Sequence, residues 1–276
     1  MRRLFPWQVP PMPRLTIMAK GNADVRGSLH ALHENDAVTW NGLNALVRDR
    51  HPGWVVRVIH ETMTRSDALL APASAPPASL AERVLPLGPF SVASQFATEL
   101  FDKDADVVVL SIQPDVMNRV VKHRADGHLF YPYDAEAWSA EDRAWLVDRY
   151  LPEASLEPLE SMANLAEITA RIRQRGDPII LIYNLSPIVP WERLHCYQGL
   201  SETLAERIRR FNLALVELSR STGVSIVDVD SVVARVGADR VKLDTILLNA
   251  EGCRLVAEEV LRVLEDQDCF VQAEAA

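Results

Sequence analysis

Five short runs of mostly apolar, β-branched residues are spaced along the chain. Nearly continuous hydrophobicity, rather than alternation, is typical of strands that are buried on both faces of a sheet. These runs therefore predict five buried strands, at 15–19, 54–59, 107–112, 179–183 and 224–229.

Segments with helical spacing of apolar residues lie between these runs, at 36–50, 154–175, 201–222 and 249–265. Strands that alternate with helices imply right-handed crossovers and a parallel sheet covered on both sides. We expect a single α/β domain over 1–276, built as a three-layer α/β/α sandwich around a five-stranded parallel sheet. Ligands in such a fold bind beyond the carboxyl ends of the strands.

Two stretches depart from the alternation. Residues 71–90 are rich in Pro and Ala, which indicates a surface connection. Residues 123–153 are long for a connection and rich in aromatic residues, so they form either an insertion that acts as a lid or binding loop, or a packed helix pair. The aromatic side chains between 130 and 150 could line an apolar pocket, although helical spacing is also typical of a core.

Composition narrows the classes of partner. The 276 residues carry a formal net charge of -9, and binding to a nucleic-acid backbone needs clustered positive charge, so no nucleic-acid partner is expected. No stretch approaches the length of a membrane span. Three cysteines without a paired motif indicate neither disulfides nor a zinc site. We expect a cytoplasmic protein without a metal or other cofactor.

Polar and charged side chains follow the predicted strands. Because carboxyl ends of parallel strands share one edge, these residues form a candidate site for a small polar or anionic molecule. Acids, bases and anion-binding donors together also suit proton transfer. The set comprises Lys20, Asn22, Asp24 and Arg26, then His60 and Glu61, then Gln113, Asp115 and Asn118, and finally Asn184, Ser186 and Asp244.

Several of these residues also have structural interpretations. Asp24 and Arg26 could cap and pair on the surface of the following helix. His60 and Glu61 could belong to a solvated loop. Asp244 could hold its loop by bonding backbone amides rather than by acting in catalysis.

Two blocks near opposite ends of the chain resemble those of the SGNH hydrolases, also called GDSL esterases and lipases. Gly21-Asn-Ala-Asp-Val-Arg-Gly27 resembles the block that carries the nucleophilic serine after the first strand. Asp244-Thr-Ile-Leu-Leu-Asn249 resembles the final block, which carries the aspartate and histidine of the triad. The resemblance implies an SGNH-like fold over most of the chain.

The catalytic residues of that family do not carry over with the blocks. Ala23 stands at the serine position and Leu247 at the histidine position, so the resemblance leaves neither a nucleophile nor a base. Asp115 stands where the family has an oxyanion-binding asparagine, and an ionised carboxylate repels an oxyanion. Asp244 alone matches a member of the triad.

Three functional hypotheses follow. In the first, the protein is a non-canonical enzyme that uses His60, Glu61, Asp115, Lys20 and Asp244 for acid and base chemistry. In the second, it is a catalytically silent module that binds a ligand, or a protein partner through 123–153. In the third, the blocks are misaligned and the protein is an ordinary serine esterase.

Overall fold

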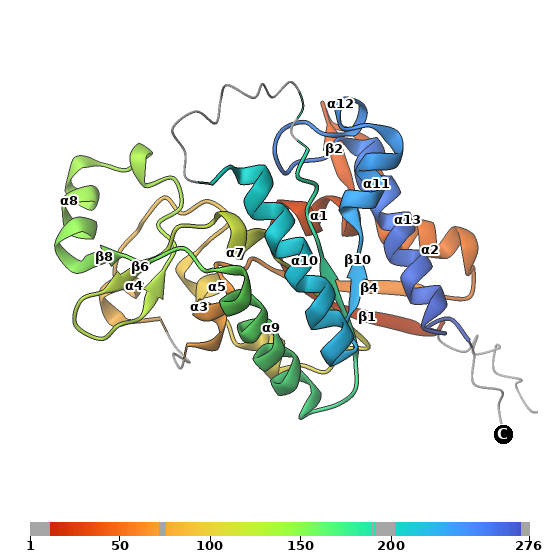
Figure 1. The fold of residues 1–276 in the computed structure, drawn as a ribbon, viewed down its shortest axis with the longest axis horizontal. Coiled ribbons are helices and arrows are strands. Elements are labelled where there is room, and N and C mark those ends of the chain that lie inside the picture. Colours follow the sequence, from red (N-terminus) through yellow and green to blue (C-terminus); the bar gives the residue numbers. More distant parts are fainter. Residues whose placement is uncertain (1–11, 72–75, 189, 191–201, 272–276) are drawn as a thin grey trace, which may run out of the picture.

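The computed structural model describes residues 12–71, 76–188, 190 and 202–271. All five predicted strands form one parallel sheet of order β10-β9-β5-β1-β4 (Figure 1). The first four strands begin and end within two residues of the predicted bounds, and the last is shorter than expected. Their bounds are β1 Arg14–Lys20, β4 Val55–Glu61, β5 Val107–Ser111, β9 Ile179–Tyr183 and β10 Ser225–Val227.

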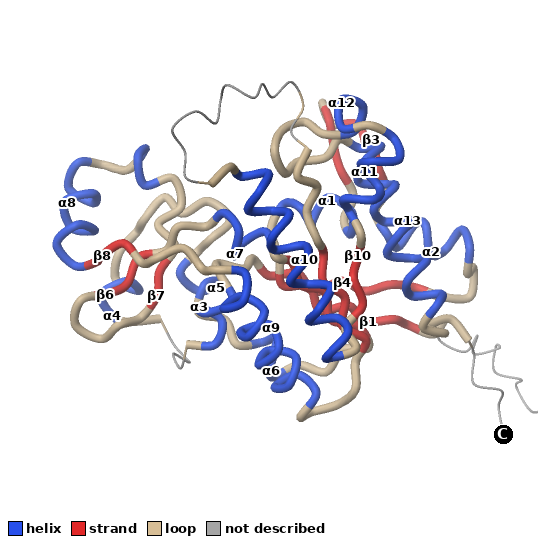
Figure 2. Tube along the Cα trace, in the orientation of Figure 1, coloured by secondary structure: helices blue, strands red, loops and turns tan. Residues whose placement is uncertain are grey.

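Successive residues of the central strands face two different cores, as expected for a sheet buried on both sides. In β5, Val107 and Val109 pack in one core, whereas Val108 and Leu110 pack in the other. The three-layer α/β/α architecture predicted from the sequence is therefore confirmed, with red strands between blue helices in Figure 2.

Each face of the sheet has its own group of helices. The first core receives α1 (Ala23–Leu29), α2 (Leu43–Arg50), α11 (Val229–Val236) and α13 (Ala250–Asp266). The second receives α6 (Glu99–Asp102), α7 (Gln113–Met117), α9 (Pro158–Arg173) and α10 (Leu204–Thr222). Residue 201, where the sequence places the start of α10, lies outside the described residues. The short α12 (Ala238–Val241) packs beside α11 and α13.

The helix predicted over 36–50 is only half right. Its first part is β3 (Ala37–Trp40), which forms an antiparallel hairpin with β2 (Leu32–Glu34), just before the predicted helix. Asn35 and Asp36 join these strands with φ of 48° and 64°, the left-handed pair that a tight hairpin turn requires. Gly42, at φ 80°, then redirects the chain into α2.

The two irregular stretches pack against each other. Residues 123–153 belong to a small sheet of order β7-β6-β8, with β6 Val121–His123, β7 Leu129–Phe130 and β8 Tyr150–Pro152. Its other elements are the 3-10 helix Ala135–Ala137 and α8 (Ala140–Arg149), so the segment is not a simple helix pair. Leu80 and Leu87 of the 71–90 connection share its apolar core, and residues 72–75 lie outside the described residues.

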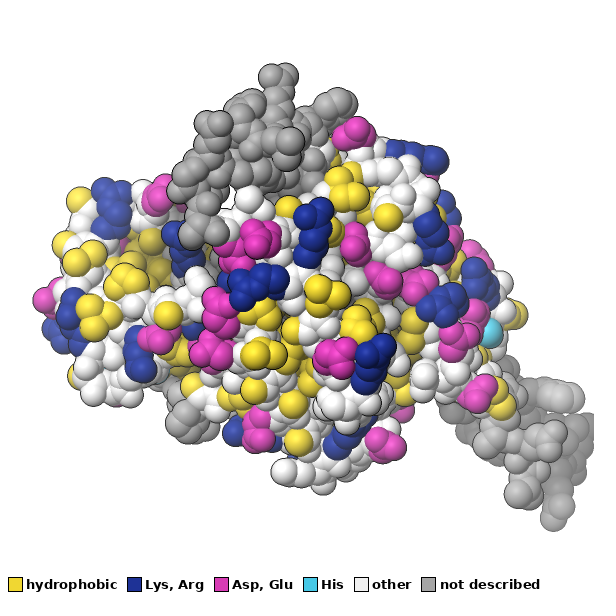
Figure 3. Space-filling view, in the orientation of Figure 1, with side chains coloured by type: hydrophobic (Ala, Val, Ile, Leu, Met, Phe, Trp, Pro, Cys, Tyr) yellow, Lys and Arg dark blue, Asp and Glu magenta, His cyan; other side chains and the backbone are white. Residues whose placement is uncertain are grey.

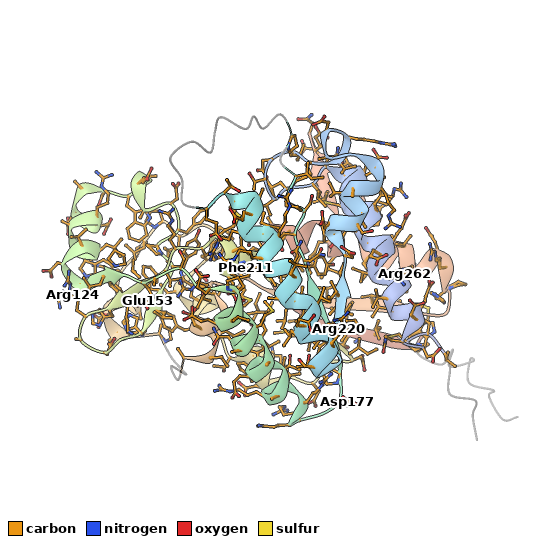
Figure 4. The ribbon with its side chains drawn as sticks, viewed as in Figure 1. Arg124, Glu153, Asp177, Phe211, Arg220 and Arg262 are labelled. Atoms are coloured by element: carbon orange, nitrogen blue, oxygen red, sulfur yellow. The ribbon has the colours of Figure 1, made fainter. Side chains whose placement is uncertain are left out.

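This small subdomain sits at one end of the molecule, where Figure 4 labels Arg124 and Glu153. The 71–90 connection contains α4 (Ala78–Ala81). In the sequence, α3 (Ser66–Leu70) comes directly before this connection and α5 (Val92–Gln95) directly after it. On the face shown in Figure 3, positive and negative side chains are interspersed over α9 and α10. Among the described residues, no helix has the length and apolarity needed to span a bilayer.

Candidate functional site

A pocket of about 700 Å³ opens at the carboxyl edge of the sheet. The chain order reverses at β1, which lies between β4 and β5, and open α/β sheets bind ligands at such a switch point. The described residues that line the pocket come from chain segments that are far apart in sequence. These residues are Gly21, Asn22, Ala23, Arg26, His60, Thr62, Pro89, Phe90, Gln113, Met117, Asn118, Tyr131, Tyr133, Asp244, Thr245, Ile246 and Leu247.

The turn after β1 supplies one wall of this pocket. The Asn22 side chain donates from Nδ2 to Gln113 Oε1 at 2.8 Å, and its Oδ1 accepts from the Met63 amide at 3.1 Å. These bonds tie the turn to the segments that follow β4 and β5. The next residue, Ala23, begins α1 and is exposed to the pocket, where it offers only a methyl group.

The loop before α13 supplies a second wall. Asp244 Oδ1 accepts hydrogen bonds from the amides of Ile246 and Leu247, both at 2.7 Å, so the carboxylate holds the loop. Asp244 Oδ2 accepts no hydrogen bond from the described residues. Leu247 is 40% exposed and lines the pocket with Asp244. The two sequence blocks, more than 200 residues apart, therefore meet at one pocket.

His60 lines the pocket with both ring nitrogens engaged. Its Nε2 lies 2.9 Å from the Gly21 carbonyl oxygen, and its Nδ1 lies 3.1 Å from His30 Nε2. A carbonyl oxygen only accepts, so Nε2 of His60 carries the proton and Nδ1 accepts from His30. Burial, together with nearby His30 and Arg26, lowers the pKa of His60 to about 4. At neutral pH this side chain is a neutral imidazole without a free nitrogen.

Lys20 and Glu61 form a pair that is not part of the described lining. Their side chains are 2% and 13% exposed, and Lys20 Nζ lies 2.9 Å from Glu61 Oε2. Lys20 also donates to the Ser94 carbonyl oxygen at 3.3 Å. Burial lowers the pKa of the Lys20 ammonium, and Glu61 opposes that shift. The pair joins the ends of β1 and β4 to α5.

Asp115 is buried in α7 and is also outside the described lining. Its Oδ1 accepts from the Ser66 amide at 2.7 Å and its Oδ2 from Ser161 Oγ at 2.5 Å, which link α7 to α3 and α9. Burial raises the pKa of this carboxyl to about 6. Gln113 and Asn118, from the same short helix and its end, do line the pocket.

Asp24, Asn184 and Ser186 line a second, small cavity of about 20 Å³. Asp24 Oδ2 accepts from Ser111 Oγ, and its buried Oδ1 has no hydrogen-bond partner among the described residues. Burial raises the pKa of this carboxyl. Asn184 donates to Asp228 Oδ1 at 2.8 Å, which fixes the start of α11. The structure thus separates these three residues from the larger pocket.

Aromatic side chains from the two irregular stretches line the pocket: Tyr131 and Tyr133 belong to the 130–150 aromatic residues that the sequence suggested for a pocket, whereas Phe90 was not singled out. Phe90 packs edge-on against Tyr131, with ring centroids 4.9 Å apart, and beside Tyr133 at 5.2 Å. The two tyrosines alternate around Pro132 directly after β7, a non-helical spacing that distinguishes them from the core residues Trp138 and Tyr150. That spacing was the available signal.

Serine and cysteine side chains near the sheet edge are engaged or buried. Ser28 Oγ lies 2.9 Å from the Tyr183 hydroxyl, and Ser111 donates to Asp24. Cys253 is buried in α13, and burial raises the pKa of its thiol to about 11. Thr62, which lines the pocket, donates to Ser94 Oγ at 3.0 Å. None of these groups is bonded to a histidine among the described residues.

No protein-family profile and no curated protein matches the sequence. Solved structures do match. LAE5, an alpha/beta hydrolase enzyme from the metagenome of Lake Arreo, is 14% identical with a TM-score of 0.50, over 94% of this chain and 97% of that one. A variant of Axe2, an acetyl-xylooligosaccharide esterase from Geobacillus, is 12% identical with a TM-score of 0.50, over 91% and 94%.

A member of the lipolytic G-D-S-L family from Veillonella parvula is also matched, at 10% identity and a TM-score of 0.47, over 91% of this chain and 98% of that one. Identities this low concern the fold alone. The two matches at a TM-score of 0.50, LAE5 and Axe2, together with the strand order, show that the chain has the α/β/α fold of these two enzymes.

Proposed function

We propose that the protein binds a small molecule with a ring and an acidic group in the 700 Å³ pocket, and that it does not hydrolyse esters through a serine. The observation that carries this proposal is the convergence of Ala23 and Leu247 on that pocket. Both occupy positions that need a polar group in a serine hydrolase, and both are apolar.

The pocket lining supports a ligand of this kind. Phe90, Tyr131 and Tyr133 offer ring faces and edges for stacking. Arg26 is exposed and is the one Lys or Arg among the described lining residues, so it can bind a carboxylate or phosphate in a bidentate manner. Gln113 Nε2 donates to none of the described residues and remains available to a ligand.

Acid and base catalysis receives less support than binding. Lys20 and Glu61 neutralise each other away from the lining, and Asp115 is bonded to two serines. The imidazole of His60 has both nitrogens occupied. Of the five residues assigned to acid and base chemistry, Asp244 alone lines the pocket with an oxygen that accepts no hydrogen bond from the described residues, and one carboxylate without a partner is a weak catalyst.

The test is a calorimetric titration with aromatic carboxylic acids and uronic acids. We expect saturable binding of at least one probe, and Arg26→Ala should weaken it by about tenfold or more because a charge-assisted hydrogen bond is lost. Arg48→Ala is the matched control, since Arg48 is an exposed arginine of α2 outside the lining.

Two results would contradict the proposal. An equal loss of affinity in the Arg26 and Arg48 variants would show that Arg26 does not contact the ligand. Covalent labelling of the unaltered protein by a fluorophosphonate would identify an active serine and support the ordinary esterase instead.

A further inference from the structure

Three side chains that commonly bind metals converge in the hairpin between β6 and β7. His123 ends β6, Asp126 lies in the turn and His128 immediately precedes β7. The His123 amide donates to the His128 carbonyl oxygen at 2.9 Å, and the Gly127 amide donates to the His123 carbonyl oxygen at 3.0 Å. Gly127 has φ +76°, which glycine adopts without strain, and the tight turn brings Asp126 to both histidines.

The donor atoms of this cluster face one another. Asp126 Oδ1 lies 2.8 Å from His123 Nδ1 and is also hydrogen-bonded to His128 Nδ1. All three atoms lie within 4.8 Å of one another, and no other such group of His, Cys, Asp or Glu occurs among the described residues. Metal bonds of ~2.1 Å in a tetrahedral site would separate ligand atoms by roughly 3.4 Å. Small side-chain rotations therefore suffice to admit an ion.

A buried tyrosine orients one of the two imidazoles. His128 Nε2 lies 2.9 Å from the hydroxyl of Tyr150, which belongs to β8 and is 3% exposed. The His123 and His128 rings are both buried and stack with centroids 4.6 Å apart. Metal-binding histidines usually bond through their second nitrogen to a group that fixes the ring. Tyr150 is placed to do this for a metal at Nδ1.

We propose that His123, Asp126 and His128 bind a zinc-type divalent metal ion. Two imidazoles and one carboxylate suit Zn²⁺ and neighbouring transition metals, whereas Mg²⁺ and Ca²⁺ prefer oxygen ligands throughout. The Asp126 side chain is 54% exposed, so solvent can supply the fourth ligand.

Metal binding changes the tautomer of both histidines without a net release of protons from neutral imidazoles. In the metal-free site each Nδ1–H donates to Asp126. On binding, Nδ1 gives its lone pair to the metal and the proton resides on Nε2, so the hydrogen bond between His128 and Tyr150 reverses direction. The ion would stabilise the β6–β7 hairpin, which leads to the pocket residues Tyr131 and Tyr133. This effect does not depend on which ligand the pocket binds.

Calorimetric titration of the metal-stripped full-length protein with Zn²⁺ tests this site. We expect one Zn²⁺ per chain and no binding of Mg²⁺ at the same concentration. His123→Ala and His128→Ala should each lower the zinc affinity by about a hundredfold. His33→Ala is the matched control, because His33 and Asp36 repeat the His-x-x-Asp spacing in the exposed β2–β3 hairpin.

Unsaturable binding, or affinity unchanged in both cluster variants, would overturn the proposal and leave a hydrogen-bonded turn. If the alanine variants fail to fold, Tyr150→Phe keeps the ring and should still lower the zinc affinity by about tenfold. In the unaltered protein, ¹⁵N spectra should show two histidines changing from the Nδ1–H to the Nε2–H tautomer with one equivalent of Zn²⁺. Unchanged tautomers would also overturn it.

Discussion

Neighbouring residues at the end of β1 face different surroundings. Lys20 is buried against Glu61, whereas Ala23 and Arg26 line the pocket. Residues three apart share one face of a helix, so the start of α1 at Ala23 places Arg26 beside it. Asp24, one position on, turns instead to Ser111 in the sheet. The chemistry of this edge depends on which face each residue occupies.

The buried carboxyl of Asp115 should make stability depend on pH. Its pKa is about 6 in the folded protein and ~3.9 when unfolded, so the folded state holds the extra proton between these values. The stabilisation is fully present below pH ~4 and is lost as the pH rises through 6. We expect the unfolding free energy of the unaltered protein, relative to Asp115→Asn, to fall by about 2 kcal/mol between pH 4 and pH 7.

Urea unfolding at pH 4, 5, 6 and 7 measures this difference. For Asp36→Asn, at an exposed position in the β2–β3 turn, the unfolding free energy should change with pH in parallel with that of the unaltered protein. If the unfolding free energy of Asp115→Asn also ran parallel to that of the unaltered protein, the titration of Asp115 would not contribute to stability. Ligand affinity should be unchanged in both variants.

The sequence identifies the edge of the sheet that carries polar groups but not the face on which each group lies. Asn22, Arg26, Gln113 and Asn118 line the pocket as expected from their places after strands. Asp115 follows β5 by the same logic, yet it is bonded to Ser66 and Ser161. These partners come from distant helices, and a local pattern does not contain their positions.

At the scale of elements, strong periodicity predicted most of the fold. The five apolar runs became the five strands, and the long amphipathic segments became α9, α10 and α13. Residues 36–50 were misassigned because Asn35 and Asp36 form a hairpin turn next to a helix of only eight residues. The small sheet around 123–153 was missed because its strands have two or three residues each.

Gln95 of α5 joins the two aromatic walls of the pocket. It is 8% exposed, and its Nε2 donates to the carbonyl oxygens of Phe90 at 2.8 Å and Tyr131 at 3.0 Å. Its Oε1 accepts from the Tyr131 amide at 2.8 Å. Gln95→Ala leaves these backbone groups without their partner, so we expect a loss of about 2 kcal/mol in unfolding free energy and weaker ligand binding.

Hydrogen exchange at the Tyr131 amide separates this positioning role from general destabilisation. Exchange there should accelerate in Gln95→Ala more than at amides of the central strands. Gln174→Ala, at the exposed end of α9, is the control and should leave both exchange and ligand affinity unchanged. Equal acceleration throughout the protein would argue against a local role for Gln95.

At the scale of the whole molecule, the fold brings the segment after the first strand and the loop before the last helix to one pocket. Ala23 and Leu247 both line it, and Gly27 of α1 packs so closely on α13 that an added Cβ would lie 2.6 Å from Cys253 Sγ. Asp244 Oδ2, beside these positions, accepts no hydrogen bond from the part of the chain that the structure describes. In the resemblance to the SGNH hydrolases, Ala23, Asp244 and Leu247 stand at the three triad positions, and two of them are aliphatic.

On this alignment, a serine at position 23 together with a histidine at position 247 should form a reactive pair. We expect Ala23→Ser/Leu247→His to be labelled by a fluorophosphonate roughly a hundredfold faster than Ala23→Ser alone, because a serine hydroxyl needs a base to remove its proton. Ala23→Ser/Leu243→His is the control, with its histidine in the same loop at a position 67% exposed and outside the described lining. Equal labelling of the two double variants would mean that position 247 does not face position 23 closely enough for proton transfer, and the SGNH alignment of the final block would then be wrong.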